Sequence, residues 1–255
     1  MALTLKKGLG QHFLHDENMC RKIVGQITRE AGMQLLEIGP GGGAITKYLL
    51  QWKDVQYKAI EIDDEKAIFL KQTYPDITDK LLHVDFLKAP IPFGGRFSVI
   101  GNFPYNISSQ ILFRLLDWHT QVHETIGMFQ KEVAQRVAAP PGNKEYGILS
   151  VLVQAYFEVS YLFDVPPGCF NPPPRVMSGV IRLANKGNPY QIENYKAFAL
   201  VVKTAFNQRR KMMRNGLKGL FPADILTQEV FSKRAEQLSV ADFVALYRLY
   251  LQSKS

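Results

Sequence analysis

The 255-residue sequence has only two cysteines, Cys20 and Cys169, which excludes a disulfide framework and a cysteine-rich metal cluster. We expect both to be small buried side chains in a reducing compartment, and we expect no metal site. No apolar run approaches the 18 or so residues that a membrane span requires. The first residues, Met1 to Gly8, lack a signal peptide's apolar stretch. Repeats and low-complexity tracts are also absent. These absences predict a cytoplasmic protein without a membrane partner.

Excess negative charge is lacking too, because the formal net charge is +8. From Asn185 onward there are 12 Lys and Arg residues against 5 Asp and Glu, whereas the first 184 residues hold 19 against 18. The pattern predicts a nearly neutral body with a basic lobe for a polyanion. A solvated basic surface without a partner is the alternative.

The chain is long enough for one large domain and a smaller one. Lys186–Pro189, with its glycine and proline, marks the expected boundary, so we predict domains 1–184 and 185–255. Beyond the boundary the pattern is helical, with no convincing strand. The apolar content of 46% suits a packed globular core.

Short apolar runs with strand character alternate with helical patterns in the first domain. This alternation predicts the α/β class, a parallel sheet with helices on both faces. The segment Ile148–Phe157 fits either a helix or a buried strand, and prolines make Val165–Pro174 an extended loop. The expected strands are Gln34–Ile38, Val55–Ile60, Leu81–Val84, Phe97–Ile100, Glu124–Phe129 and Val176–Leu183, and the expected helices are Asp16–Ala31, Ala44–Gln51, Glu65–Thr73 and Ser108–Trp118.

A glycine-rich turn, Glu37-Ile38-Gly39-Pro40-Gly41-Gly42-Gly43-Ala44, follows the first strand and opens a helix. Its glycines permit a tight turn and let backbone N–H groups approach a ligand closely. Gly39, Gly41 and Ala44 also satisfy the dinucleotide fingerprint, so an NAD-binding fold stays an alternative.

Three carboxylates stand at or near successive strand ends. Glu61, 22 residues after Gly39, is placed to accept hydrogen bonds from ribose hydroxyls, which NAD and S-adenosylmethionine share. Glu37 would face a pyrophosphate unfavourably but suits a ligand with an ammonium group and a sulfonium. Asp85 is expected to accept from the cofactor's adenine amine. Each carboxylate alone could be a solvated strand end; together they favour S-adenosylmethionine.

Asn102-Phe103-Pro104-Tyr105 follows the fourth strand. The N6 amine of adenine is a poor nucleophile, because its lone pair is delocalised into the ring. The side-chain oxygen of Asn102 and the backbone oxygen of Phe103 can accept hydrogen bonds from both N–H groups, which localises the lone pair. Pro104 keeps Phe103 out of helical geometry, and Tyr105 offers a face for stacking. Alone, the tetrapeptide is also an ordinary strand-ending turn.

Phe170 is a large apolar residue within the proline-rich segment. It is placed either to stack on the target base opposite Tyr105 or to anchor the loop on the core, and the sequence leaves both possibilities open.

Further motifs accompany these. They are Gly10–Asp16, Glu61-Ile62-Asp63, Asn102–Ser108, Gln130–Arg136, Tyr146–Val151, Phe170–Val176 and Ala205–Lys211. Together with the glycine turn they resemble the ribosomal RNA adenine dimethyltransferases of the KsgA type, relatives of the erythromycin-resistance methylases, over nearly the whole chain.

The resemblance implies a class I, Rossmann-like S-adenosylmethionine-dependent methyltransferase domain followed by a small all-helical RNA-binding domain. It implies dimethylation of the N6 amines of two adjacent adenosines, in a hairpin loop near the 3′ end of small-subunit (16S) ribosomal RNA. The implied setting is maturation of a pre-30S particle, by a monomeric enzyme.

By the family's motifs, His12 and Leu14 line the cofactor site, Gly39 contacts the methionine part and Asn102 bridges cofactor and target base. Many relatives have Asn where this chain has His12, so only the backbone role carries over. Phe103 replaces the commoner Leu or Ile, without consequence for a backbone acceptor. The full assignment is His12, Leu14, Glu37, Gly39, Gly41, Glu61, Ile62, Asp85, Phe86 and Asn102 for the cofactor, and Asn102, Phe103, Pro104, Tyr105 and Phe170 for catalysis.

The segment Lys203–Lys218 would carry a basic stripe if it were one helix, although a bend near Asn207 is possible. Lys203, Arg210, Arg214 and Lys218 then fall within about 80°, at 100° per residue. The apolar arc would comprise Val201, Ala205, Met212, Met213 and Leu217. Phosphate contacts to folded RNA are therefore expected from Lys203, Arg209, Arg210, Lys211, Arg214 and Lys218.

Three other functions remain open from the sequence. One is a ribosome-assembly protein whose methylation is dispensable, and the intact Glu37, Glu61 and Asn102 argue against loss of activity. Another is a resistance methylase acting on large-subunit RNA, which the full basic domain and the Phe-Asn-Pro-Pro-Pro-Arg segment disfavour. An NAD oxidoreductase lacks an evident acid or base for hydride transfer.

Overall fold

The computed structural model describes residues 12–254. Gly10 and Gln11 of the first family motif, and the leading stretch Met1 to Gly8, lie outside the described residues. The chain forms two compact units. The first comprises the residues up to Ala134 together with Glu158–Asn185, and the second comprises Gln135–Phe157 and the residues from Lys186 onward. The chain passes into the second unit for the last time after Asn185, next to the boundary that we predicted. The second unit also contains Gln135–Phe157, which we had assigned to the first domain.

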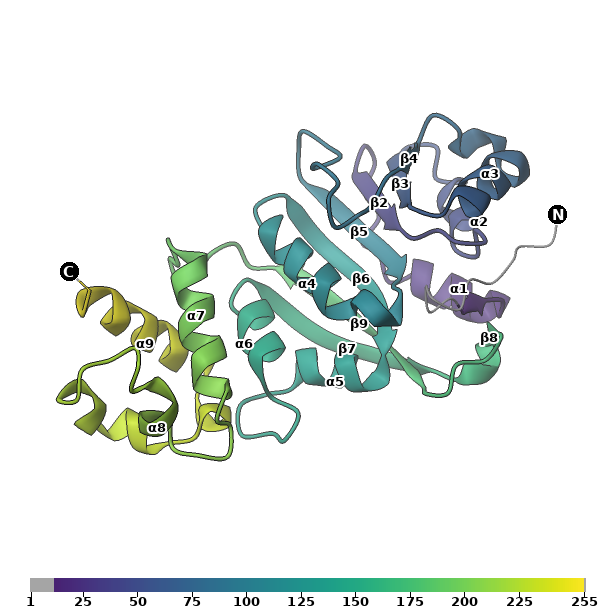
Figure 1. Cartoon of the computed structure of the whole chain (residues 1–255). Coiled ribbons are helices and arrows are strands. Elements are labelled where there is room, and N and C mark those ends of the chain that lie inside the picture. The colour runs from purple at the N-terminus through teal and green to yellow at the C-terminus, as the bar shows by residue number, and fades with distance from the viewer. Residues whose placement is uncertain (1–11, 255) are drawn as a thin grey trace. The chain divides into compact units, whose positions relative to one another are not determined.

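A seven-stranded sheet with the order β4-β3-β2-β5-β6-β9-β7 forms the centre of the first unit (Figure 1). Strands β4, β3, β2, β5 and β6 run parallel to their neighbours in this series, and β9 pairs antiparallel with β6. The predicted α/β class is confirmed. The strands are β2 (Gln34–Ile38), β3 (Gln56–Glu61), β4 (Leu81–His83), β5 (Phe97–Asn102), β6 (Val122–Gln130), β7 (Phe157–Val165) and β9 (Ser178–Asn185).

The inner strands are apolar because both of their faces are covered, as in most parallel sheets. In β2, Leu35 and Leu36 are fully buried, and in β5 the same holds for Val99 and Ile100. The helices of this unit are α1 (Glu17–Val24), α2 (Thr46–Leu49), α3 (Asp64–Thr73) and α4 (Ser108–Asp117), and α5 (Lys131–Ala138) follows β6.

Two helices are shorter than the sequence predicts. Asp16 caps α1 as expected, accepting a hydrogen bond from the backbone N–H of Met19 (2.8 Å). The helix nevertheless ends at Val24, before its C-cap Gly25, and does not reach Ala31. Helix α2 covers only the middle of the predicted Ala44–Gln51.

The strand order reverses between β2 and β5. From β2 the chain proceeds to β3 and β4 on one side, whereas β5 and β6 lie on the other. Ligands of open α/β sheets bind beyond the carboxyl ends of the strands at such a switch point. Glu37 of β2 is paired in register with Ala59 of β3 and Ile100 of β5. It therefore stands at the carboxyl edge where a ligand is expected.

The proline-rich segment is only partly an extended loop. A 3-10 turn covers Pro167–Cys169, and β8 (Phe170–Asn171) pairs antiparallel with β1 (Phe13–Leu14). The prolines exclude a central strand, but they allow the two-residue strand β8 just before Pro172. The pairing places Leu14 opposite Phe170. Cys20 and Cys169 are buried free cysteines, as predicted.

After Asn185, the described part of the second unit contains helices and turns but no strand. Its helices are α6 (Ile148–Gln154), α7 (Tyr195–Phe206), α8 (Met213–Leu217) and α9 (Val240–Gln252). The segment Ile148–Phe157, which the sequence left open between helix and strand, is mostly helix α6. In the described part of the chain, no helix combines the length and apolarity that crossing a membrane requires.

Lys203–Lys218 is not one helix, and the chain breaks near Asn207, where the sequence allowed a bend. Helix α7 ends at Phe206, and α8 begins only at Met213. The intervening run, 207–212, is Asn-Gln-Arg-Arg-Lys-Met, and its one apolar side chain, Met212, is exposed, so none holds a helical turn against a core. The basic stripe therefore does not lie on one helix face. Of the predicted apolar arc, Val201, Ala205, Met213 and Leu217 are buried, but Met212 is 48% exposed.

Two paired glycines make room for the side chain that follows β5. Gly101 and Gly127 are register partners on β5 and β6, and a Cβ on either would lie 2.5 Å from the ring of Phe103. That ring also packs against Phe129, with centroids 4.9 Å apart. The glycines thus fix where the backbone of Phe103 leaves the sheet.

We expect Gly127→Ala to destabilise the protein by about 1–3 kcal/mol, because the added methyl overpacks a buried aromatic pair. Urea unfolding measures this. Gly94→Ala is the matched control, since a Cβ there meets open space. Equal stability of the two variants would contradict the packing account.

Candidate cofactor and adenine-binding site

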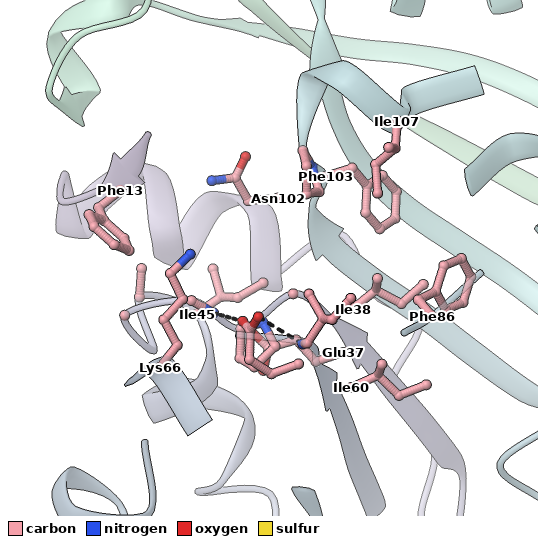
Figure 2. Close-up of a pocket in the computed structure, with 18 of the residues that line it drawn as sticks. Phe13, Glu37, Ile38, Ile45, Ile60, Lys66, Phe86, Asn102, Phe103 and Ile107 are labelled. Carbon is pink, nitrogen blue, oxygen red and sulfur yellow. Dashed lines mark hydrogen bonds between the residues drawn. The ribbon is translucent and has the colours of Figure 1, made fainter. Parts of the chain in front are cut away.

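A cavity of about 290 Å³ opens at the carboxyl ends of β2, β3 and β5. Figure 2 shows Glu37 between Ile38 and Ile60, with Asn102 and Phe103 across the cavity from them. All ten residues assigned to the cofactor line this cavity, as do four of the five catalytic residues; Phe170 does not. With that exception, the residues predicted from the sequence lie together at one cavity.

The glycine turn is held by the end of β3. Gly39 and Gly41 adopt φ angles of +67° and +56°, which favour glycine. The N–H of Gly39 donates to the backbone oxygen of Ile60 (2.9 Å), and the N–H of Gly41 donates to Glu61 Oε2 (3.1 Å). The turn and the carboxylate predicted to hold the ribose are thus joined directly.

Glu61 has further partners at its other oxygen. Oε1 accepts from the N–H groups of Ile62 (2.9 Å) and Asp63 (3.0 Å). A carboxylate has about four acceptor sites, so the three backbone donors orient Glu61 and leave capacity for a hydroxyl from a ligand.

Glu37 lies at the floor of the cavity and is fully buried. Its carboxylate accepts from Thr46 Oγ1 (3.0 and 2.9 Å) and from the hydroxyl of Tyr57. Burial raises the pKa of Glu37 to about 7, the two hydroxyl donors oppose that rise, and the Glu61 charge adds to it. A cation in the cavity would favour the charged carboxylate.

The end of the cavity predicted to bind adenine contains one carboxylate acceptor, Asp85, and apolar side chains beside it. Asp85 Oδ1 accepts from the N–H of Leu87 (2.9 Å), and its side chain is 31% exposed. Ile62 and Val84 line the cavity although they are 55% and 40% exposed, whereas Phe86 is buried. Exposed apolar side chains that flank a carboxylate suit a flat heterocycle with an amine.

Asn102 ends β5 with its amide held in one orientation. Nδ2 donates to the backbone oxygen of His12 (3.3 Å), so Oδ1 is the atom that can accept from a substrate. Within the described residues, no group donates a hydrogen bond to the backbone oxygen of Phe103 either. Pro104, at φ −58° and ψ 129°, turns the chain away from the sheet. The two predicted acceptors are thus adjacent in the chain and available.

Tyr105 is anchored by its hydroxyl, which lies 2.5 Å from Ser178 Oγ at the start of β9. Burial raises the pKa of this phenol above its usual value. Its ring is partly exposed and lines the cavity, 5.7 Å from the ring of His12 between centroids.

Phe170 is not at the cavity. It is 2% exposed and belongs to the apolar cluster that includes Leu14 and Val165. Pairing of β8 with β1 turns it into the core. Of the two roles that the sequence left open, the position of Phe170 fits an anchor of the loop on the core. It does not fit stacking on a base in the cavity.

Phe13 and Lys66 are among the cavity-lining residues that sequence reasoning did not assign to the site (Figure 2). The ammonium of Lys66 lies 5.3 Å from the ring centroid of Phe13, and Lys66 is only 6% exposed. Phe13 stands between His12 and Leu14 in a quoted motif, which was a usable signal. Nothing in the helical pattern of α3 marks Lys66.

The predicted RNA-binding residues all belong to the second unit. Lys203, Arg210, Lys211, Arg214 and Lys218 are exposed. Arg209 is partly buried and donates to the backbone oxygen of Lys144. No group of metal-ligating side chains is present among residues 12–254.

The sheet order and the site define the class of protein, a class I methyltransferase fold. The structure is similar to a dimethyladenosine transferase from Plasmodium falciparum, at a TM-score of 0.84 and 24% identity, covering 95% of this chain and 98% of the other. It is also similar to the 23S rRNA methyltransferase ErmE, at a TM-score of 0.71 and 22% identity, covering 95% and 100%. These similarities show the fold alone.

Sequence comparison shows the family. The family model of ribosomal RNA adenine dimethylase matches residues 2–252, and the chain belongs to this family. It is 47% identical to ribosomal RNA small subunit methyltransferase A of Porphyromonas gingivalis, over 99% of this chain and all of that protein. The protein of the same name from Flavobacterium johnsoniae is 49% identical, over 94% of each chain.

The raised pKa of Glu37 predicts a pH effect on stability in the absence of cofactor. The folded state favours protonated Glu37, so the linked stability is fully present below pH 4.5 and lost as pH rises through about 7. Glu37→Gln lacks this dependence. Its unfolding free energy relative to the wild-type protein should increase by about 2.5 kcal/mol between pH 5 and pH 8.

Denaturant unfolding at the two pH values measures the change. Glu158→Gln, at an exposed carboxyl, is the control and should show no such trend. A constant difference between Glu37→Gln and wild type would contradict a raised pKa.

Proposed function

We propose that this protein transfers methyl groups from S-adenosylmethionine to the N6 amines of two adjacent adenosines in a hairpin loop near the 3′ end of 16S ribosomal RNA. The observation that carries the proposal is the hydrogen bond from Asn102 Nδ2 to the backbone oxygen of His12, which leaves Oδ1 beside the open backbone oxygen of Phe103. Family membership and the relatives named small subunit methyltransferase A support this substrate.

The residues of the cavity fit S-adenosylmethionine by their chemistry. Glu37 supplies a buried negative charge for the cationic amino acid part. Glu61 has acceptor capacity for ribose hydroxyls, and Asp85 lies between exposed apolar side chains suited to adenine. When bound, this cofactor supplies an activated methyl group on a sulfonium.

The work of the protein is orientation of the amine. Asn102 Oδ1 and the backbone oxygen of Phe103 accept from the two N–H groups, which localises the nitrogen lone pair. These hydrogen bonds strengthen as positive charge develops on nitrogen, so they stabilise the transition state more than the bound substrate. No general base has to act during attack, because the proton leaves after the bond forms. A neutral Asn suits that role better than a charged carboxylate.

Tyr105 serves as the stacking face. Its hydroxyl is engaged by Ser178, so the ring, not the phenol, meets the base. Stacking of a base on an aromatic face contributes about 1–3 kcal/mol.

The second unit supplies phosphate contacts through its exposed Lys and Arg side chains. We infer that the substrate is a pre-30S particle in the cytoplasm and that the protein acts as a monomer. A resistance methylase for large-subunit RNA is the competing function, since ErmE shares the fold. Relatives named for the small subunit, at 44–49% identity, favour the first function.

The decisive experiment is methyl transfer to purified small subunits that lack the modification, with mass-spectrometric mapping of the modified nucleotides. Two adjacent N6,N6-dimethyladenosines are expected. Modification of large-subunit RNA alone would support the competing function.

Asn102→Ala should reduce methyl transfer by at least about 100-fold, in line with removal of a single transition-state acceptor. Binding to small subunits should stay within about twofold, because the phosphate contacts remain. Filter binding and single-turnover kinetics separate the two effects. Asn18→Ala, at an exposed position on α1, is the matched control. Equal loss of binding and methylation would contradict an orienting role.

Charge reversal of Arg210 and Arg214 should weaken binding to the small subunit and reduce the slope of log affinity against log salt. Two lost phosphate contacts correspond to a slope change of about 1.4–1.8. Reversal of Lys71 and Arg96, exposed side chains of the first unit, is the charge-matched control. Unchanged affinity and slope would mean that the two arginines form only a solvated surface.

A further inference from the structure

Among the described residues that line the cavity, three are acidic and only one is a lysine or arginine. The acidic residues are Glu37, Glu61 and Asp85, and the basic one is Lys66 of α3. Lys66 is 6% exposed. Burial of a charged group is costly and is tolerated mainly where the charge meets an opposite charge or polar groups. Lys66 thus supplies positive charge to a cavity that is otherwise lined by carboxylates.

The backbone of Lys66 is fixed by the end of β3. Asp63 caps α3, and its Oδ1 accepts from the N–H groups of Glu65 (3.0 Å) and Lys66 (3.3 Å). The N–H of Asp63 in turn donates to Glu61 Oε1 (3.0 Å). One short hydrogen-bonded segment therefore positions both Lys66 and the proposed ribose acceptor.

The side chain of Lys66 reaches the part of the cavity next to the glycine turn. Its ammonium lies 5.3 Å from the ring centroid of Phe13, within the range of a cation–π contact. The same ring covers the turn, since a Cβ on Gly41 would lie 3.6 Å from it. Figure 2 shows the ammonium directed toward the side of the cavity where Phe13 and Asn102 lie. Phe86, at the end predicted to bind adenine, lies on the opposite side.

The amino acid part of S-adenosylmethionine carries an ammonium, a sulfonium and a carboxylate. The two cationic groups suit a cavity with buried acidic side chains, whereas the carboxylate does not. Glu37 and Glu61 would repel it, and this repulsion is strong where water is excluded. A cation beside the carboxylate offsets the repulsion. Lys66 has the required charge and lies away from the predicted adenine end.

We propose that Lys66 is the counterion of the cofactor's carboxylate and makes the site selective for a methyl donor that retains this group. The inference rests on the cofactor of the proposed function but not on its RNA substrate. It adds a specificity-determining residue on α3 to a site otherwise assigned to the strand ends and the segment before α1. With the carboxylate held by Lys66, the ammonium of the same amino acid part is left to Glu37.

The test compares two methyl donors that differ only in this group, S-adenosylmethionine and its decarboxylated analogue. Calorimetry on the full-length protein measures both affinities. Lys66→Met keeps an apolar side chain of similar length but removes the charge. It should weaken binding of S-adenosylmethionine by about 10- to 150-fold, the range for a hydrogen bond to a charged group. It should bind the decarboxylated analogue within about threefold of wild type or more tightly, because a like charge beside this more cationic ligand is removed.

Lys71→Met, at an exposed lysine of the same helix, is the matched control and should leave both affinities unchanged. Lys66→Gln removes the charge without adding an apolar group, and it should change the preference between the two donors in the same way. Thermal unfolding without ligand shows whether each variant is folded.

Two results would overturn the proposal. Equal loss of affinity for both donors in the Lys66 variants would place the ammonium at a part that the donors share, such as the ribose. Unchanged affinity for both would make Lys66 only a packing partner of Phe13.

Failure of the proposed function is a separate result. If wild type binds S-adenosylmethionine but transfers no methyl group to small subunits, the proposed RNA substrate is wrong, and the binding data alone decide the role of Lys66. If wild type binds neither donor, the assignment of Lys66 fails whatever the variants do.

Discussion

The tie between the glycine turn and the end of β3 is the constraint on which the site depends. Gly39 and Gly41 donate backbone hydrogen bonds to Ile60 and Glu61, so the turn after β2 has one position relative to β3. Glu61 is oriented by the same contacts. A turn placed differently would separate the buried carboxylate of Glu37 from Glu61, the proposed ribose acceptor. The cofactor half of the cavity is therefore a property of two adjacent strand ends, not of a flexible loop.

The other half of the cavity depends on β5 and on chain segments far from it in sequence. Paired glycines at 101 and 127 make room for the ring of Phe103. Asn102 receives its orientation from residue 12, and Tyr105 from Ser178. The tetrapeptide Asn102–Tyr105 is thus positioned by contacts that span the first unit.

Much of the first unit could be predicted from the sequence, because apolar runs buried on both faces and ended by glycine or acid are distinctive. Strand β2 was predicted with its exact bounds. Strand β7 was not predicted, because Glu158, Ser160 and Asp164 give it the look of a polar segment and much of it is only half buried. Phe170 shows the same limit, since a sequence cannot tell which way a loop aromatic turns. Lys66 reaches the cavity only through tertiary packing, and the break after Phe206 interrupts a pattern that fits a single helix.

The segment from Pro172 to Ser178 contacts two side chains that line the cavity. It behaves as a spacer with a contact at each end, one to each ring that borders the gap beside Asn102. Insertion or deletion of a residue in this spacer would alter the width of the gap while leaving every side chain of the tetrapeptide unchanged. The length of this proline-rich segment therefore sets the distance between the two rings.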